Sequence, residues 1–227
     1  MTRTQTPAEP STLIRTDATH LTTIAFLHVD PGDQDRAVAL ASDAATRMSR
    51  TAGGAVNVLR SLDGSRVCRY EQWDDDQALR TAHDADDVRR LHELARALAT
   101  NDPRPRRYTV VHADDRSADG VSVIAPSYAG AIFLNEITTQ PATQDRLLEL
   151  VIANNEVQSL DTPGYRSANF HRSTDGLRAV NYSLWDTAEQ CIDAISRMAD
   201  MDTNLEETVQ IAEPDFRFYA LAHASRS

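Results

Sequence analysis

The sequence predicts an α+β fold made of two tandem copies of one module, each with its elements in the order β-α-β-β-α-β. One observation is an internal repeat, in which residues 60–74 (RSLDGSRVCRYEQWD) align without a gap with residues 172–186 (RSTDGLRAVNYSLWD). Another is that the same succession of strand and helix patterns surrounds both stretches. A chain of 227 residues is long enough for two domains of about 100 residues each.

The repeat extends to both sides and sets the expected domain boundaries. QDR at 34–36 aligns with QDR at 144–146, and YTVVHA at 108–113 aligns with YALAHA at 219–224. We therefore expect a first module over residues 19–113 and a second over residues 128–225. Residues 1–18 are expected to form a flexible N-terminus. Residues 114–127 are polar and rich in small residues, which is typical of a linker.

The elements of a copy can be followed in order in the second one. An alternating apolar strand covers residues 131–138, and Thr143 is placed to cap a helix over residues 144–160. Pro163-Gly164 ends that helix, and Asp175-Gly176 is a strong hairpin signal between strands over residues 166–173 and 178–185. A single second helix around residues 191–198 and a closing strand over residues 216–224 complete the copy.

This order is that of the ferredoxin-like unit, whose antiparallel sheet carries helices on one face and leaves the other face apolar. Residues two apart share a face of a strand, so Val180, Tyr182 and Leu184 are expected on that uncovered face. Two joined copies can cover these faces with each other. We therefore expect an intrachain pseudo-dimer that resembles a dimeric α/β barrel, and further association into a homo-oligomer is left open.

The composition is that of a globular protein and excludes several partners. Apolar residues make up 41% of the chain, and the formal net charge of −11 disfavours binding to nucleic acid. No apolar stretch approaches the roughly 20 residues that cross a bilayer, and the N-terminal segment lacks the apolar core of a signal peptide. A cytoplasmic protein without a membrane partner is expected. Cys68 and Cys191 have no CxxC partner and are expected to be buried thiols, and no pattern for a metal site or phosphate loop is found.

The stretch PGYRSANFHRSTDGLRAVNYSLW, residues 163–185, resembles the antibiotic biosynthesis monooxygenase (ABM) family, in particular its small quinone-forming members in aromatic polyketide pathways. Those enzymes are single modules that form homodimers, so this chain would be a tandem-repeat member. The resemblance implies a cofactor-independent monooxygenase with molecular oxygen as co-substrate. It implies oxidation of an aromatic polyketide intermediate, from the anthrone or hydroquinone type to a quinone, in a cavity between the sheet and the helices.

The resemblance also assigns catalytic roles to three residues of the second copy. Asn181 and Trp185 match an asparagine and a tryptophan implicated in oxygen chemistry, and His171 matches a pocket histidine. Asn181 could donate its amide N–H to a developing oxyanion, and Trp185 could donate its indole N–H or stack on the substrate. His171 could act as a base or proton shuttle. We expect all three side chains in the cavity of the second copy.

The first copy departs from the family at these positions. Arg69 stands where the second copy has Asn181, Leu59 stands where it has His171, and only Trp73 is retained. The second copy is therefore expected to carry the chemistry, with the first as a scaffold or a pocket for something else. The candidate substrate-binding residues are Ser183 and Phe170 in the second copy and Trp73 and Arg69 in the first.

Other interpretations stay open. Trp185 is repeated as Trp73, which also fits a packing role. A polyketide cyclase would use the same cavity without consuming oxygen, and a non-catalytic ligand-binding accessory protein would only hold a ligand there. A haem-degrading monooxygenase would need a histidine ligand on the second helix, near the place of His83.

Overall fold

The structure is a computed structural model that describes residues 12–116, 122–159, 162–200 and 205–226. The first module contains one strand and a long helix, then two strands, two short helices and a last strand. These elements are β2 (Leu21–His28), α1 (Gln34–Ala52), β3 (Ala55–Ser61), β4 (Arg66–Trp73), α2 (Asp76–Asp84), α3 (Asp86–Arg96) and β5 (Arg106–Asp115), with a 3-10 turn, Pro31–Asp33, before α1.

The second module repeats this order with β7 (Ala131–Thr138), α4 (Gln144–Ser159), β8 (Tyr165–Ser173), β9 (Arg178–Trp185), α5 (Ala188–Asp200), α6 (Leu205–Ile211) and β10 (Glu213–Arg226). The strands predicted over 131–138 and 178–185 are confirmed. Gly176 has a φ of 78°, as the predicted hairpin turn requires. The prediction of one second helix per copy is wrong, because two short helices lie there. In the first module Ala85, with extended backbone angles, separates them.

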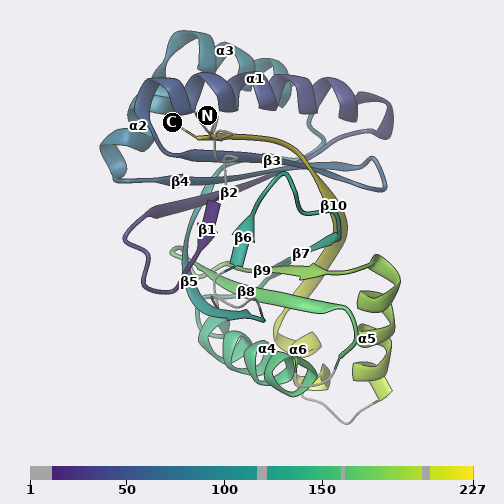
Figure 1. Cartoon of the computed structure of the whole chain (residues 1–227). Helices are drawn as coiled ribbons and strands as arrows, with labels where there is room; N and C mark the ends of the chain where they lie inside the picture. The colour runs from purple at the N-terminus through teal and green to yellow at the C-terminus, as the bar shows by residue number, and fades with distance from the viewer. Residues whose placement is uncertain (1–11, 117–121, 160–161, 201–204, 227) are drawn as a thin grey trace, which may run out of the picture.

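The eight long strands close one barrel in the order β10-β3-β4-β2-β5-β8-β9-β7. The last strand of each module crosses to the other module. β5 pairs with the first half of β2 and then runs along β8, and β10 pairs with β7 and then with β3. Helices α1 to α3 cover one side of the barrel and α4 to α6 the opposite side (Figure 1). The predicted intrachain barrel is confirmed, and shared strands join its two halves.

The inside of the barrel is an apolar core that both modules build. Val180, Tyr182 and Leu184 are buried there, as the alternation of β9 predicts. The repeated tyrosines Tyr70 and Tyr182 meet across it, with ring centroids 6.2 Å apart. The opposite face of each half-sheet packs against its own helices in a separate core. Any cavity between sheet and helices therefore belongs to a single module.

Two short strands lie in the segments that the sequence predicts to be a flexible N-terminus and a linker. β1 (Thr12–Ile14) pairs with β6 (Ser122–Ile124), and Ile14 and Ile124 are each 1% exposed in the barrel core. Burying such a side chain contributes about 1.5–3 kcal/mol. The prediction of a flexible N-terminus is therefore wrong for residues 12–14. The linker prediction is wrong for residues 122–124 and for residues 114–115, which end β5. The module boundaries themselves stay a prediction.

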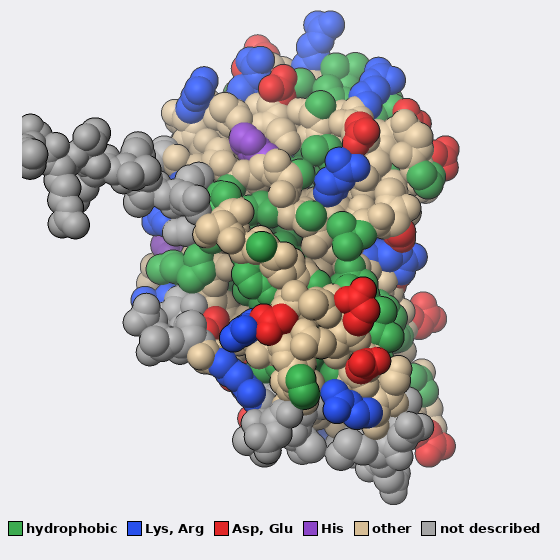
Figure 2. Space-filling model, turned by 45° about the vertical axis from the view of Figure 1, so that its right-hand side comes forward, with side chains coloured by type: hydrophobic (Ala, Val, Ile, Leu, Met, Phe, Trp, Pro, Cys, Tyr) green, Lys and Arg blue, Asp and Glu red, His purple; other side chains and the backbone are tan. Residues whose placement is uncertain are grey.

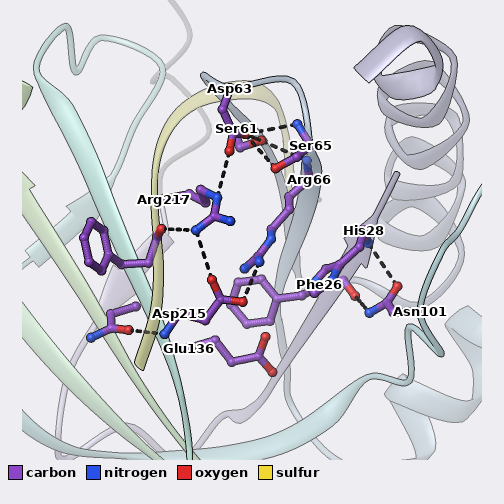
Figure 3. A network of polar contacts seen from close by, with 12 residues as sticks. Phe26, His28, Ser61, Asp63, Ser65, Arg66, Asn101, Glu136, Asp215 and Arg217 are labelled. Atoms are coloured by element: carbon purple, nitrogen blue, oxygen red, sulfur yellow. Dashed lines mark hydrogen bonds and ion pairs between the residues drawn. The ribbon is translucent and has the colours of Figure 1, made fainter. Parts of the chain in front are cut away.

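A polar network links the two modules at one end of the barrel (Figure 3). Arg66 on β4 donates from Nη2 to Asp215 on β10 over 2.5 Å, and Arg217 on β10 lies 2.7 Å from Asp63 in the turn after β3. Arg66 is only 6% exposed, whereas the side chain of its partner Asp215 is 41% exposed, so water reaches one side of this ion pair. Because β4 belongs to the first module and β10 to the second, these contacts fix how the modules meet.

The surface carries charges of both signs, and basic and acidic side chains are interspersed on the face shown in Figure 2. Exposed pairs such as Arg47 with Asp87 and Arg166 with Asp186 account for part of this pattern. Such pairs contribute about 0–1 kcal/mol each. Within the described ranges, no helix combines the length and the apolar character that a membrane span needs.

Candidate active site

The second module contains an open-mouthed cavity of about 300 Å³ between the outer face of its sheet and helices α4 to α6. Four predicted site residues line it together: Phe170, Asn181, Ser183 and Trp185. Most of the remaining wall is apolar or aromatic, with Phe133 from the sheet among it. A mostly apolar cavity with a few convergent polar groups is the usual form of a small-molecule site. The alternation of β9 predicts this face correctly.

Asn181 is one of the polar groups that line the cavity. It lies mid-strand on β9, opposite Asn135 on β7 and Phe170 on β8. Its amide oxygen is buried and has no hydrogen-bond partner among the described residues. The two ends of an amide have the same shape, so the unpaired end can equally be the NH₂ group. Leaving a buried polar group unpaired costs about 1–3 kcal/mol, which points to a partner supplied by a ligand.

Trp185 lines the cavity, and its indole N–H already makes a hydrogen bond. It donates to Ser183 Oγ over 3.0 Å, and Tyr165 packs edge-on against the ring with centroids 5.3 Å apart. Ser183 accepts this bond, so its own O–H is left to donate. The sequence offers Trp185 two roles, an N–H donor or a stacking surface, and the geometry favours stacking.

Tyr165 and Asp114 form a hydrogen-bonded pair at the cavity that the sequence does not predict. The Tyr165 phenol lines the cavity, donates to Asp114 Oδ2 over 2.7 Å and accepts from Asn155 Nδ2 over 3.2 Å. Burial, together with the Asp114 carboxylate, raises the pKa of Tyr165 well above its usual value, so the phenol stays protonated. Asp114 lies in the segment predicted as a linker, which hid its proximity to Tyr165.

His171 does not lie in this cavity, contrary to the sequence prediction. Its neighbour Phe170 points into the cavity, so His171 points into the barrel core and is fully buried. Its Nδ1 lies 3.2 Å from the Asn169 carbonyl, which makes Nδ1 the protonated nitrogen. Nε2 then accepts from the Tyr70 hydroxyl over 3.1 Å. His171 thus bridges the two modules as a neutral structural imidazole.

His171 should make the stability of the protein depend on pH. Burial lowers the pKa of His171 from 6.5 to about 4. As the pH falls below the unfolded value, the unfolded chain takes up this proton and the folded chain does not. Stability is therefore full above about pH 6.5 and is lost between there and about pH 4, by about 3 kcal/mol. Urea unfolding of the wild type and of His171→Gln across this window should show a smaller pH dependence for the variant. Equal slopes would contradict this account.

The first module has its own cavity, of about 470 Å³, at the equivalent place, and its wall is charged. Arg69, His83 and His92 line it beside small apolar residues. Arg69 lies where predicted, on the face equivalent to that of Asn181. Trp73 does not line the cavity. It is packed in the core beneath it, and its indole donates to Glu71 Oε2 over 3.0 Å.

Glu71 is the centre of a buried polar network behind this cavity. Its carboxylate accepts from Thr23 Oγ1 and His83 Nε2 over 2.9 Å each, and Arg69 Nε contacts its other oxygen. Burial alone would raise the pKa of Glu71, but the charge of Arg69 and the hydrogen bonds from His83 and Trp73 lower it far below its usual range. Glu71 is therefore ionised. The sequence contains no motif that predicts this cluster.

His92 completes the network as a neutral acceptor. Arg69 Nη1 lies 2.7 Å from His92 Nε2, and an arginine can only donate, so Nε2 accepts. Burial and the charge of Arg69 lower the pKa of His92 to about 3. Within the described residues, no group of three His, Cys, Asp or Glu side chains is placed to hold a metal ion. Cys68 and Cys191 are buried free thiols, as predicted.

Solved structures with a similar fold are monooxygenase-like proteins. An anthrone oxidase-like protein superposes with a TM-score of 0.82 at 17% identity, over 95% of this chain and 96% of that one. A protein named as a monooxygenase from Fusobacterium nucleatum gives 0.62 at 9% identity, over 93% and 96% of the two chains. One from Lactobacillus acidophilus gives 0.55 at 11%, over 92% and 97%.

The chain has the tandem ferredoxin-like fold of ABM-type proteins. No protein-family model and no curated protein sequence matches it. At these identities the likeness to ABM-type proteins shows the fold alone, because one fold can carry many functions.

Proposed function

We propose that this chain is a cofactor-independent monooxygenase that oxidises an aromatic polyketide intermediate, of the anthrone or hydroquinone type, to a quinone in secondary-metabolite biosynthesis. The observation that carries the proposal is the unpaired, buried amide oxygen of Asn181, a residue that lines an aromatic-walled cavity. A flat ring fits such walls, and the amide turned with its NH₂ group to the unpaired side can donate to an oxygen atom of the ligand or of dioxygen.

The chemistry needs no group that the chain lacks. Deprotonation of an anthrone CH₂ gives an electron-rich carbanion that can itself reduce dioxygen, so a carbon–oxygen bond forms and a peroxide results. Loss of water from the peroxide leaves the carbonyl, so CH₂ and O₂ give C=O and H₂O. The protein has to hold the ring and stabilise negative charge. Asn181 donates to the developing oxyanion, Trp185 and Phe170 pack on the ring, and Ser183 donates from its hydroxyl.

The proton is assigned to the Tyr165–Asp114 pair, because among the described residues no histidine lines the second cavity. Tyr165 takes the substrate proton on its oxygen while its own hydrogen passes to the Asp114 carboxylate, 2.7 Å away. The phenol thus stays neutral, in keeping with its raised pKa. This pair takes the role that the sequence gives to His171.

Tyr165→Phe is expected to lower kcat by about 10²-fold or more, because it removes the relay but keeps the ring. KM should change little. Steady-state oxygen uptake at several substrate concentrations separates the two parameters. Tyr128→Phe is the matched control, since Tyr128 bonds the backbone carbonyl of Trp185 and does not line the cavity. A Tyr165→Phe enzyme with unchanged kcat would rule out the relay.

Aerobic incubation of the pure protein with dithranol, a hydroxylated anthrone, tests the proposed function. Oxygen uptake above the spontaneous rate, together with the quinone as product, supports it. A cyclase or a binding module would consume no oxygen, and product formed without oxygen would separate a cyclase from a binder. The haem-degrading interpretation would need the free Nδ1 of His83 as the iron ligand, because its Nε2–H donates to Glu71. A Soret shift on adding hemin would support it.

A further inference from the structure

The two modules share one fold, which makes each an internal control for the other. At the positions of Arg69, Glu71 and His83, the second module has Asn181, Ser183 and Ile195. The second module builds the same sheet and helices without any of these ionisable groups. The fold therefore does not need the charged cluster of the first module. Burying charges is unfavourable unless they are paired, so a cluster that the fold does not require points to a function.

The cluster is arranged as a base beside a cation. Glu71 fixes the His83 ring through Nε2–H, which leaves the lone pair of Nδ1 as the basic nitrogen of a ring that lines the cavity. Arg69 lines the same cavity and uses Nε for Glu71 and Nη1 for His92. Its Nη2 has no hydrogen bond to any residue in the described ranges. A carboxylate-held imidazole and a guanidinium facing one cavity match the needs of proton abstraction next to a carbonyl.

We infer that the first module's cavity is a second, acid–base site that abstracts a proton from the carbon next to the carbonyl group of an apolar, enolisable ketone. His83 is the catalytic base, Arg69 binds the oxygen that becomes negative, and Glu71 and His92 are positioning residues. Alanine, leucine, valine and proline side chains make up most of the remaining wall and would hold the apolar part of the ketone, while Glu93, Arg96 and Arg104 also line the cavity.

The step balances without a co-reactant. The C–H bond breaks, its proton moves to His83 Nδ1, and its electron pair forms the C=C bond of an enolate. The oxygen then carries the negative charge, beside Arg69. Return of a proton from His83 to the same carbon restores the ketone, so in heavy water the net result is exchange of hydrogen for deuterium. This activity uses a different cavity and no oxygen. The proposed oxygenation can therefore fail while this activity is present, and the reverse.

Deuterium exchange without oxygen tests the inference. The full-length protein is incubated in anaerobic heavy water with α-tetralone, a two-ring aryl ketone, and loss of the proton signal next to the carbonyl is followed by NMR. The wild type is expected to exceed the uncatalysed rate by about 10²-fold or more. His83→Ile places in the first module the residue that the second module carries there, and it should return exchange to the uncatalysed rate. His83→Gln, which keeps a polar side chain, should do the same.

The control is His20→Ile, because His20 is an exposed histidine that lines neither cavity. It should exchange at the wild-type rate. Circular dichroism and thermal unfolding establish that each variant is folded, and two different replacements of His83 guard against one of them failing to fold. A wild-type protein that does not accelerate exchange would overturn the inference. So would a folded His83 variant that exchanges as fast as the wild type.

Discussion

Asn181→Ala is expected to slow anthrone oxidation by about 100-fold or more, which is the scale seen when one donor to a developing oxyanion is lost. The amide makes no hydrogen bond with its buried oxygen in the described part of the chain, so its removal should change the free energy of unfolding little. Asn181→Asp keeps the size of the side chain but places a negative charge beside a developing anion. It should lose at least as much turnover. Oxygen uptake under saturating substrate measures both losses.

The assignment of the active cavity depends on which variant loses turnover, Asn181→Ala or Arg69→Ala. If Asn181→Ala keeps full turnover while Arg69→Ala abolishes it, oxidation takes place in the first module and the proposed division of roles is wrong. Urea unfolding of Asn181→Ala serves as the control, because a large loss of stability would mean that Asn181 supports the fold instead of the reaction.

Glu71→Ala is expected to destabilise the protein by about 3 kcal/mol, since it leaves Arg69, whose side chain is only 13% exposed, without its carboxylate partner. The variant also removes the acceptor for Trp73, Thr23 and His83. Ser183→Ala, at the matching position of the second module, removes only the acceptor for the Trp185 indole. It should cost about 1 kcal/mol. Urea unfolding at neutral pH compares the two variants directly.

Equal losses from Glu71→Ala and Ser183→Ala would contradict the account of a charged network held together by Glu71. A smaller loss on combining Glu71→Ala with Arg69→Ala than for Glu71→Ala alone would support it, because the second change removes the stranded cation. A double-mutant comparison of this kind isolates the interaction between neighbouring residues.

The repeat predicts most of the fold, because the motif, its hairpin turn and its flanking strands recur in the second copy. The crossing of β5 and β10 is not predictable in this way. Alternation shows that a segment is a strand and which residues share a face, but it does not show which strand lies beside it. β1 and β6 were missed because three residues are too few to show a period. These two strands form because Ile14 and Ile124 are buried in a core that is built by strands distant in the sequence.

Some residues of the candidate site can be placed from the sequence and others cannot. Alternation along β9 places Asn181, Ser183 and Trp185 correctly. The prediction for His171 is wrong because the register of the hairpin places His171 opposite Val180, a residue of the barrel core. Residues directly opposite in an antiparallel pair share a face. Phe170, opposite Asn181, is therefore the cavity residue.

Two other features could not be predicted from the sequence. Asp114 and Tyr165 are 51 positions apart and meet only because β5 crosses to the second module. The network around Glu71 joins strands β2 and β4 with helices α2 and α3, so its members share no motif and no local period. Long-range contacts of this kind depend on the three-dimensional arrangement of the elements.

Oxidation of dithranol under isotopically labelled dioxygen tests the central claim most directly. A monooxygenase of the proposed kind places one oxygen atom of dioxygen in the new carbonyl group and releases the other as water. Mass spectrometry of the quinone should therefore show one labelled oxygen, and no hydrogen peroxide should accumulate. An unlabelled quinone formed with hydrogen peroxide would mean electron transfer without oxygenation. No enzyme-dependent product at all would contradict the proposed function outright.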